Sequence, residues 1–297
     1  MAMAWPRLIH GPQTPRLRAA GVVLASHTFG TGGDVGEREA VAKIISVHSF
    51  RGGTGKSNTV ANLAVLLARR GHRVGVVDAD IQSPGIHVLF GLRGDDIKVS
   101  LNDYLWGRVS ITETAREVFT SEGGGIIYLI PASMKTSEIV QILRQGYDIR
   151  RLTEAFRELT QTLDLDMIFI DTHPGLNEET LFSLAISTAV VMVLRTDQQD
   201  YEGTGVAVEV ARSLEVPHLI LVVNKASPSL DPKAVKERLE STLQCRVGAV
   251  LPHSDEMMTL GSSDVFVRRY PNDPITKSLE AVASELESAE APASTDG

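Results

Sequence analysis

The sequence predicts an α/β fold in which a doubly wound, mostly parallel sheet of about seven or eight strands carries helices on both faces. Short apolar runs rich in Val and Ile alternate with helical patterns along the chain. The runs lack polar alternation, as expected where both faces of a sheet are covered. A glycine-rich loop follows the first run and opens the first helical pattern. Together these features favour right-handed strand–helix–strand units.

Seven buried strands are predicted from the apolar runs. In chain order they are Ile44–His48, Arg73–Val77, Ile126–Ile130, Met167–Ile170, Val190–Leu194, Leu219–Val223 and Val247–Leu251. A helix is expected over Ser57–Arg70, because its apolar residues recur at helical spacing and Gly71 provides a stop. The same spacing predicts a helix over Ile149–Leu163.

The ends of the chain differ from the rest. We divide the sequence into an N-terminal extension over 1–42, partly disordered and holding at most a short strand at Gly21–Ser26, one domain over 43–287, and an acidic disordered tail over 288–297. Near the end of the domain a helical stripe is surrounded by acidic side chains, so we expect it to pack on the core rather than on an anionic membrane. The stripe consists of Ile275, Leu279, Val282 and Leu286.

Composition excludes several classes of protein. The chain has 297 residues, with 29 Lys and Arg against 37 Asp and Glu, a formal net charge of −8. An acidic chain argues against a generally basic nucleic-acid-binding surface, though not against a local patch. The single cysteine, Cys245, excludes a disulfide framework or a thiolate cluster within one chain. No apolar run approaches the length of a membrane span. We therefore expect a cytoplasmic protein.

The strongest motif is the segment Phe50–Ser57, which reads FRGGTGKS. Its glycines let backbone N–H groups approach phosphate oxygens, and the helix that follows directs its positive dipole end to the same place. Lys56 can reach the β and γ phosphates, and the Ser57 hydroxyl can ligate Mg²⁺. We therefore predict a P-loop NTPase whose phosphate-binding residues are Gly52, Gly53, Thr54, Gly55, Lys56, Ser57 and Asn58.

The motif resembles the deviant Walker A sequence KGGxGK[ST] of the MinD/ParA family of ATPases, with Arg51 in place of the family's first lysine. The resemblance covers about residues 43–287 and implies ATP and Mg²⁺ as cofactors. Four further segments resemble stretches of the family: Val76–Asp80, Leu101–Gly107, Phe169–Gly175 and Val222–Lys225.

The resemblance implies roles for three aspartates. Asp80 orients or activates the attacking water, Asp78 supports the Mg²⁺ shell, and Asp171 holds that shell through water, so that Ser57, Asp78 and Asp171 form the metal site. Lys56, Asp80 and Arg51 form the catalytic set. The alternative is that these aspartates only cap turns and helices at strand ends.

Arg51 carries two interpretations. In the family this position is a lysine that reaches across an ATP-bound dimer to the partner's phosphates. Arginine keeps the charge but is bulkier and not interchangeable with lysine. In the alternative, Arg51 is a loop arginine held by a local carboxylate, for which Asp197 is the candidate.

A base-binding region is predicted where two late strands end. Asn224 and Lys225 follow one strand, and an asparagine amide offers both a donor and an acceptor to adenine. Ser227 stands where a GTPase would favour aspartate, so ATP is preferred. Pro252 and His253, after the last strand, would form the other side of the base site.

These features predict an ATP-hydrolysing switch that forms a homodimer in its ATP state, is stimulated by a protein partner, and positions cellular machinery at a division site, on a chromosome or plasmid, or at a flagellum. The prediction includes transient association with membrane or nucleoid DNA and recruitment to membrane, nucleoid or pole. The alternative is a nucleotide-binding regulatory scaffold with little turnover, which Arg51 favours. The related metal-cluster carriers need paired cysteines, so we expect no Fe–S cluster.

Overall fold

The computed structural model describes residues 42–290. The predicted extension and acidic tail lie outside this range except for Ala42 and residues 288–290, and the suggested strand at Gly21–Ser26 lies outside it entirely. Within the described range, no helix is both long and apolar enough to span a membrane.

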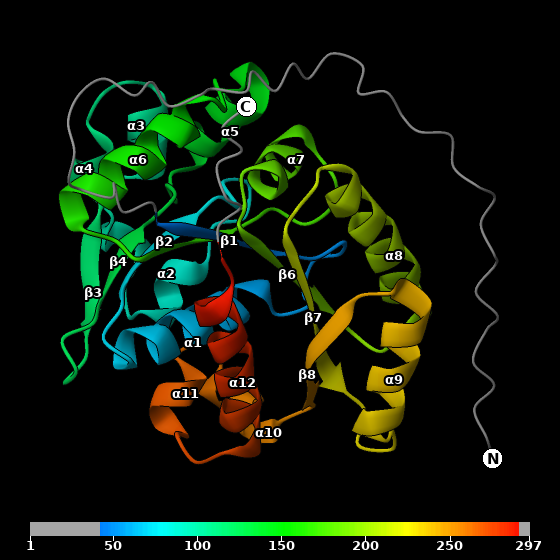
Figure 1. Ribbon diagram of the computed structural model, residues 1–297. Helices are drawn as coiled ribbons and strands as arrows, with labels where there is room; N and C mark the ends of the chain where they lie inside the picture. The colour runs from blue at the N-terminus through cyan, green and yellow to red at the C-terminus, as the bar shows by residue number, and fades with distance from the viewer. Residues whose placement is uncertain (1–41, 291–297) are drawn as a thin grey trace, which may run out of the picture. The chain divides into compact units, whose positions relative to one another are not determined.

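Eight strands form one sheet in the order β3-β4-β2-β5-β1-β6-β7-β8 (Figure 1). All neighbouring strands are parallel except β3 and β4. The strands are β1 (Lys43–His48), β2 (Arg73–Asp78), β3 (Arg116–Thr120), β4 (Ile126–Ile130), β5 (Met167–Asp171), β6 (Ala189–Leu194), β7 (His218–Ala226) and β8 (Arg246–Pro252). The doubly wound fold class is thereby confirmed.

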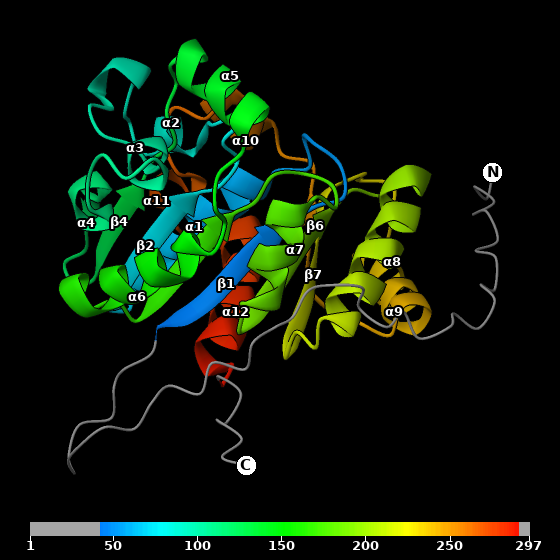
Figure 2. The ribbon, with the colours of Figure 1, turned by 90° about the horizontal axis from the view of Figure 1, so that it is seen from above.

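Helices cover both faces of the sheet (Figures 1 and 2). One core cluster joins the sheet to α1, α2, α11 and α12, and a second joins it to α3, α4 and α6. The helices are α1 (Lys56–Arg69), α2 (Ile86–Leu89), α3 (Leu101–Leu105), α4 (Ile111–Thr114), α5 (Thr136–Gln145), α6 (Arg151–Leu163), α7 (Glu178–Ala185), α8 (Gln198–Ser213), α9 (Pro232–Leu243), α10 (Asp255–Leu260), α11 (Phe266–Arg269) and α12 (Pro274–Ser288), with a short 3₁₀ turn at Gly94–Asp96.

All seven predicted strands are present, each within a few residues of its predicted bounds. The C-terminal stripe packs on the core as predicted: its four residues lie in α12 and none is more than 3% exposed. The sequence prediction missed β3, an edge strand with an intermediate or exposed side chain at every position. Such a strand lacks the apolar run by which the other strands were found.

The sheet places its functional side chains at one edge, where its central parallel strands end. The glycine-rich loop follows β1, and β1 lies between β5 and β6. The last residues of β2 and β5, Asp78 and Asp171, are direct partners in the strand register, and Asp171 is also paired with Val47 of β1. The carboxyl ends of the strands in an open α/β sheet are the usual place for a ligand.

Candidate functional site

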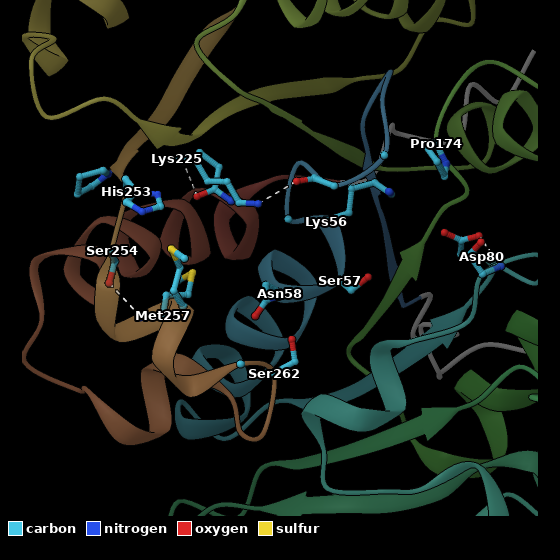
Figure 3. Close-up of a pocket in the computed structure, with 18 residues that line it drawn as sticks. Lys56, Ser57, Asn58, Asp80, Pro174, Lys225, His253, Ser254, Met257 and Ser262 are labelled. Atoms are coloured by element: carbon cyan, nitrogen blue, oxygen red, sulfur yellow. Dashed lines mark hydrogen bonds between the residues drawn. The ribbon is translucent and has the colours of Figure 1, made fainter.

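A pocket of about 810 Å³ opens at this edge of the sheet. Figure 3 shows Lys56 and Ser57 at its centre, with Asp80 and Pro174 on one side and His253 and Met257 on the other. The lining residues are Gly52, Gly53, Gly55, Lys56, Ser57, Asn58, Asp80, Ser83, Pro174, Asn224, Lys225, Pro252, His253, Ser254, Met257, Met258, Gly261 and Ser262. The structure thus brings together the predicted phosphate-binding residues, apart from the buried Thr54, and the predicted base-binding residues.

The glycine-rich loop has the backbone conformation that its glycines were expected to provide. Gly53 and Gly55 have φ angles of 77° and 104°, in the left-handed region where other residues are strained. Gly55 caps α1, whose first turn carries no acidic side chain. The positive end of the α1 dipole therefore faces the pocket without a neutralising carboxylate on the helix itself, which favours an anionic ligand.

Two residues at the end of β7 hold this loop in place. The Asn224 side chain donates from Nδ2 to the carbonyl of Thr54 at 2.8 Å, and Lys225 donates from Nζ to the carbonyl of Gly53 at 2.9 Å. A Cβ on Gly55 would lie 2.3 Å from Asn224 Nδ2, so glycine is required for this contact. The prediction gave Asn224 the role of reading a base; the contact that the structure adds is a brace on the phosphate loop.

Asp78 and Asp171 form a buried pair of carboxylates beside the loop. Both are at most 1% exposed, and Oδ1 of each lacks a hydrogen-bond partner within residues 42–290. Burial raises the pKa of Asp171 to about 6, although the Ser57 hydroxyl and the Lys56 ammonium act in the opposite direction. Burial also raises the pKa of Asp78, with the neighbouring Asp171 and Asp80 charges adding to the effect. Buried carboxylate oxygens without partners are expensive unless a cation or its water shell approaches them.

These residues fit Mg²⁺. Within the described part of the chain, no three His, Cys, Asp or Glu side chains are grouped to form a complete metal cage. Mg²⁺ in phosphate sites does not need such a cage, because it uses one or two protein oxygens and fills its shell with phosphate oxygens and water. Ser57 and Asp171 supply hard oxygen donors of this kind. Asp78 is set back, since its Oδ2 accepts the backbone N–H of Gly85 at 3.3 Å.

Asp80 differs from the other two aspartates because it lines the pocket, where it is the one acidic side chain among residues 42–290. Its Oδ1 lies 2.7 Å from Nδ1 of His173. His173 belongs to the segment after β5 that the sequence identified, but sequence reasoning assigned it no role. Only a three-dimensional contact between the loops after β2 and β5 reveals it.

Arg51 lies outside the pocket lining and is held by carboxylates of α8 and its N-cap. Its Nη1 lies 3.2 Å from Asp197 Oδ1 and 3.5 Å from Asp200 Oδ1. The predicted pairing with Asp197 is therefore confirmed. Arg195 contacts the same two aspartates, at 3.2 and 3.0 Å, so both carboxylates keep a cation if Arg51 moves.

A buried histidine beneath the loop was also missed. His48, the last residue of β1, is fully buried, and its Nδ1 lies 3.0 Å from the Thr172 hydroxyl. Burial, helped by the Lys56 and His173 charges, lowers the pKa of His48 to about 3. It is therefore neutral at physiological pH, and it connects the ends of β1 and β5 without adding charge to the site.

Known proteins resemble the chain over most of the described range. Residues 42–215 match the family described as an AAA domain. The chain is 27% identical to the flagellum site-determining protein YlxH of Helicobacter pylori, with 82% of this chain and 81% of that protein covered. It is 31% identical to an iron–sulfur cluster carrier protein of Aquifex aeolicus, over 63% of this chain but only 48% of that protein.

Solved structures show the same fold. The septum site-determining protein MinD of Pyrococcus horikoshii, solved with Mg-ADP, superposes with a TM-score of 0.70 at 21% identity. The superposition covers 83% of this chain and 96% of that one.

Proposed function

Because the chain belongs to the MinD/ParA family of P-loop ATPases, we propose that it binds and hydrolyses ATP with Mg²⁺ and dimerises in the ATP state to position other cell components. Relatives named for determining the flagellum site and the septum site support the positioning role. The observation that carries the proposal is the pocket in which the phosphate loop, Ser57 and Asp80 meet, with Asp171 buried beside it.

Each group in this arrangement has a separate task. The loop N–H groups and Lys56 bind the phosphates, and Asn224 and Lys225 keep the loop in its binding conformation. Mg²⁺, held by Ser57 and the Asp171 shell with support from Asp78, would neutralise phosphate charge. Asp80 orients the attacking water. Phosphoryl transfer depends mainly on such positioning and charge neutralisation.

The base fits the far side of the pocket. Pro252, His253 and Met257 line it there, where Figure 3 shows His253 and Met257 opposite Asp80. The α10 segment that contributes Met257 has no sequence motif, and it begins three residues after β8 ends. We propose adenine as the base, with the Asn224–Lys225 end of β7 as one wall.

Two variants test the proposal. We expect Lys56→Ala to abolish binding of a fluorescent ATP analogue, because it removes the charge at the phosphates. We expect Asp80→Ala to bind ATP, lose turnover and accumulate as a dimer with Mg·ATP, since hydrolysis no longer releases it. Light scattering measures the dimer. A monomeric Asp80→Ala protein with bound ATP would reject the switch, and tight ATP binding without wild-type turnover would favour the regulatory scaffold.

Partners and location belong to the same proposal. We propose a protein that stimulates hydrolysis and a cytoplasmic location with nucleotide-dependent recruitment to membrane, nucleoid or pole. A fluorescent fusion of the wild type beside Asp80→Ala tests this, because the trapped dimer should concentrate at the target. The absence of an Fe–S cluster stays a prediction, since a cluster carrier is among the relatives. Iron and sulfide analysis of protein purified without oxygen decides it.

A further inference from the structure

His173 holds the carboxylate that the proposed function assigns to the attacking water. Its Nδ1 lies 2.7 Å from Asp80 Oδ1, and the side chains of His173 and Asp80 are 22% and 14% exposed. The backbone N–H of Ser83 donates to the same oxygen at 3.2 Å. Both contacts hold the same oxygen, Oδ1, and the Asp80 side chain lines the pocket. A carboxylate anchored twice through one oxygen presents the other, Oδ2, in a fixed direction.

The backbone around His173 is fixed on both sides. Thr172 donates its N–H and its hydroxyl to the carbonyl of Val47, at 3.3 and 3.0 Å, and Gly175 donates its N–H to Ser49 at 3.1 Å. The Thr180 hydroxyl donates to the His173 carbonyl at 3.2 Å. The imidazole therefore projects from a segment bound to the end of β1, to the start of the phosphate loop and to α7.

The two donors to Asp80 come from different parts of the fold. Ser83 belongs to the same loop as Asp80, so its N–H cannot fix that loop relative to the rest of the site. His173 follows β5, and its segment is bound to the end of β1. The His173 contact therefore fixes the position of the loop after β2 relative to the phosphate loop. It also limits rotation of the Asp80 carboxylate about its last side-chain bond.

We propose that His173 is a positioning residue for ATP hydrolysis, which donates its Nδ1–H to Asp80 Oδ1 and so directs Oδ2 toward the attacking water. Because an ionised carboxylate only accepts hydrogen bonds, the imidazole must carry its proton on Nδ1. This inference rests on the proposed function and deepens it. A small misplacement of a group that orients a reactant can lower a rate by about 100-fold.

Three substitutions separate positioning from packing. Asparagine places an amide nitrogen where Nδ1 of histidine lies, whereas the glutamine amide extends one carbon further and alanine offers no donor. We expect His173→Ala and His173→Gln to lower kcat about 10- to 100-fold, and His173→Asn to stay within about 3-fold of wild type. The KM for ATP and the melting temperature should be similar in all three, because the ring contributes no predicted contact with ATP.

Wild-type kcat in His173→Ala, or equal losses in His173→Asn and His173→Ala at unchanged melting temperature, would overturn the inference alone. Wild-type protein that does not hydrolyse ATP, or a Lys56→Ala protein that hydrolyses as fast, would reject the proposed function and the inference together.

Discussion

At the scale of single residues, the site contains an ionisable carboxylate, Asp171, that is buried away from water. Asp171 is 1% exposed and lies beside Lys56 and Asp78. Its pKa, raised to about 6 from an ordinary value of 3.8, means that the folded chain binds this proton more tightly than the unfolded chain does. The stability that Asp171 contributes is therefore complete below about pH 4 and falls as the pH rises through about 6.

Asp171→Asn should remove this penalty because asparagine has a similar shape and no charge. We expect the free energy of unfolding of the nucleotide-free variant to exceed that of wild type by about 1–3 kcal/mol at pH 7.5, with the difference disappearing toward pH 4. Urea unfolding without Mg²⁺ from pH 4 to 8 measures it. Glu209→Gln on the exposed side of α8 is the control and should not differ from wild type. A variant less stable than wild type at pH 7.5 would contradict the prediction.

Sequence alone could predict the residues whose chemistry is local. The phosphate loop needs only its own glycines, Lys56 and the helix that follows, so its role follows from consecutive residues. The contacts of Asn224 with Thr54 and of His173 with Asp80 could not be predicted in this way, because they join segments more than 90 residues apart. Asparagine and histidine side chains also have many other uses in loops, so residue type adds little.

At the scale of elements, α8 and the start of the phosphate loop pack closely because α8 has a glycine, Gly203, at their contact. Gly203 of α8 lies under the Phe50 ring, and a Cβ at this glycine would come within 2.1 Å of Phe50 Cδ1. Phe50 immediately precedes Arg51, which pairs with Asp197 at the N-cap of the same helix. Glycine inside a helix is unfavourable, so this position indicates that close approach between helix and loop outweighs helix propensity.

Gly203→Ala and Gly205→Ala form a matched pair on α8. Alanine at 205 meets only Leu243 Cδ2 at 3.5 Å, so we expect it to stabilise the protein by up to about 1 kcal/mol. Alanine at 203 must displace the ring, and we expect it to destabilise the protein by about 1–3 kcal/mol. Thermal and urea unfolding measure both. In a Phe50→Ala background, Gly203→Ala should no longer lower the free energy of unfolding. If the destabilisation persists, the Phe50 ring is not its cause.

The strands could be predicted from the sequence where helices bury both faces of the sheet. The central strands are continuous apolar runs because helices cover both faces of the sheet, and their bounds follow from composition. β3 forms an antiparallel pair with β4 across a turn that contains Gly123, Gly124 and Gly125. That glycine cluster is a hairpin signal that the sequence offered. The strand before it was missed because its residues are polar or partly exposed and form no apolar run.

At the scale of the whole molecule, strand order assembles the site from distant segments. β1 lies between β5 and β6, and β2 lies on the far side of β5, so the phosphate loop, Asp171 and Asp78 meet at one edge. The alternation of strands and helices predicts a doubly wound sheet, but this spatial order depends on packing between helices that no short segment encodes. The same edge leaves Arg51 beside the opening, paired with α8 rather than directed into its own pocket.

This placement makes a prediction about two copies of the chain. If Arg51 acts on the phosphates of a partner protomer, Arg51→Ala should lower turnover by about 10³-fold or more while ATP affinity changes little, as for other cationic fingers. Moving the Arg51 side chain away from Asp197 and Asp200 costs little free energy, because Arg195 still contacts both carboxylates. Arg51→Lys is the control: lysine keeps the charge without the planar guanidinium group, so we expect a smaller loss of turnover than in Arg51→Ala.

Mixing two inactive variants distinguishes action within one chain from action across a dimer. In a mixed dimer of Arg51→Ala and Asp80→Ala, the first protomer keeps its own Asp80 and receives Arg51 from the second, so one complete site forms. When the variants are mixed in equal amounts before Mg·ATP is added, about half of the dimers are mixed and each has one active site of two, so the first turnover should release about a quarter of the wild-type phosphate. If Arg51 acts within its own chain, neither site is complete and the mixture stays inactive. Single-turnover phosphate release at several mixing ratios measures this, with a peak at equal amounts expected only for action across the dimer.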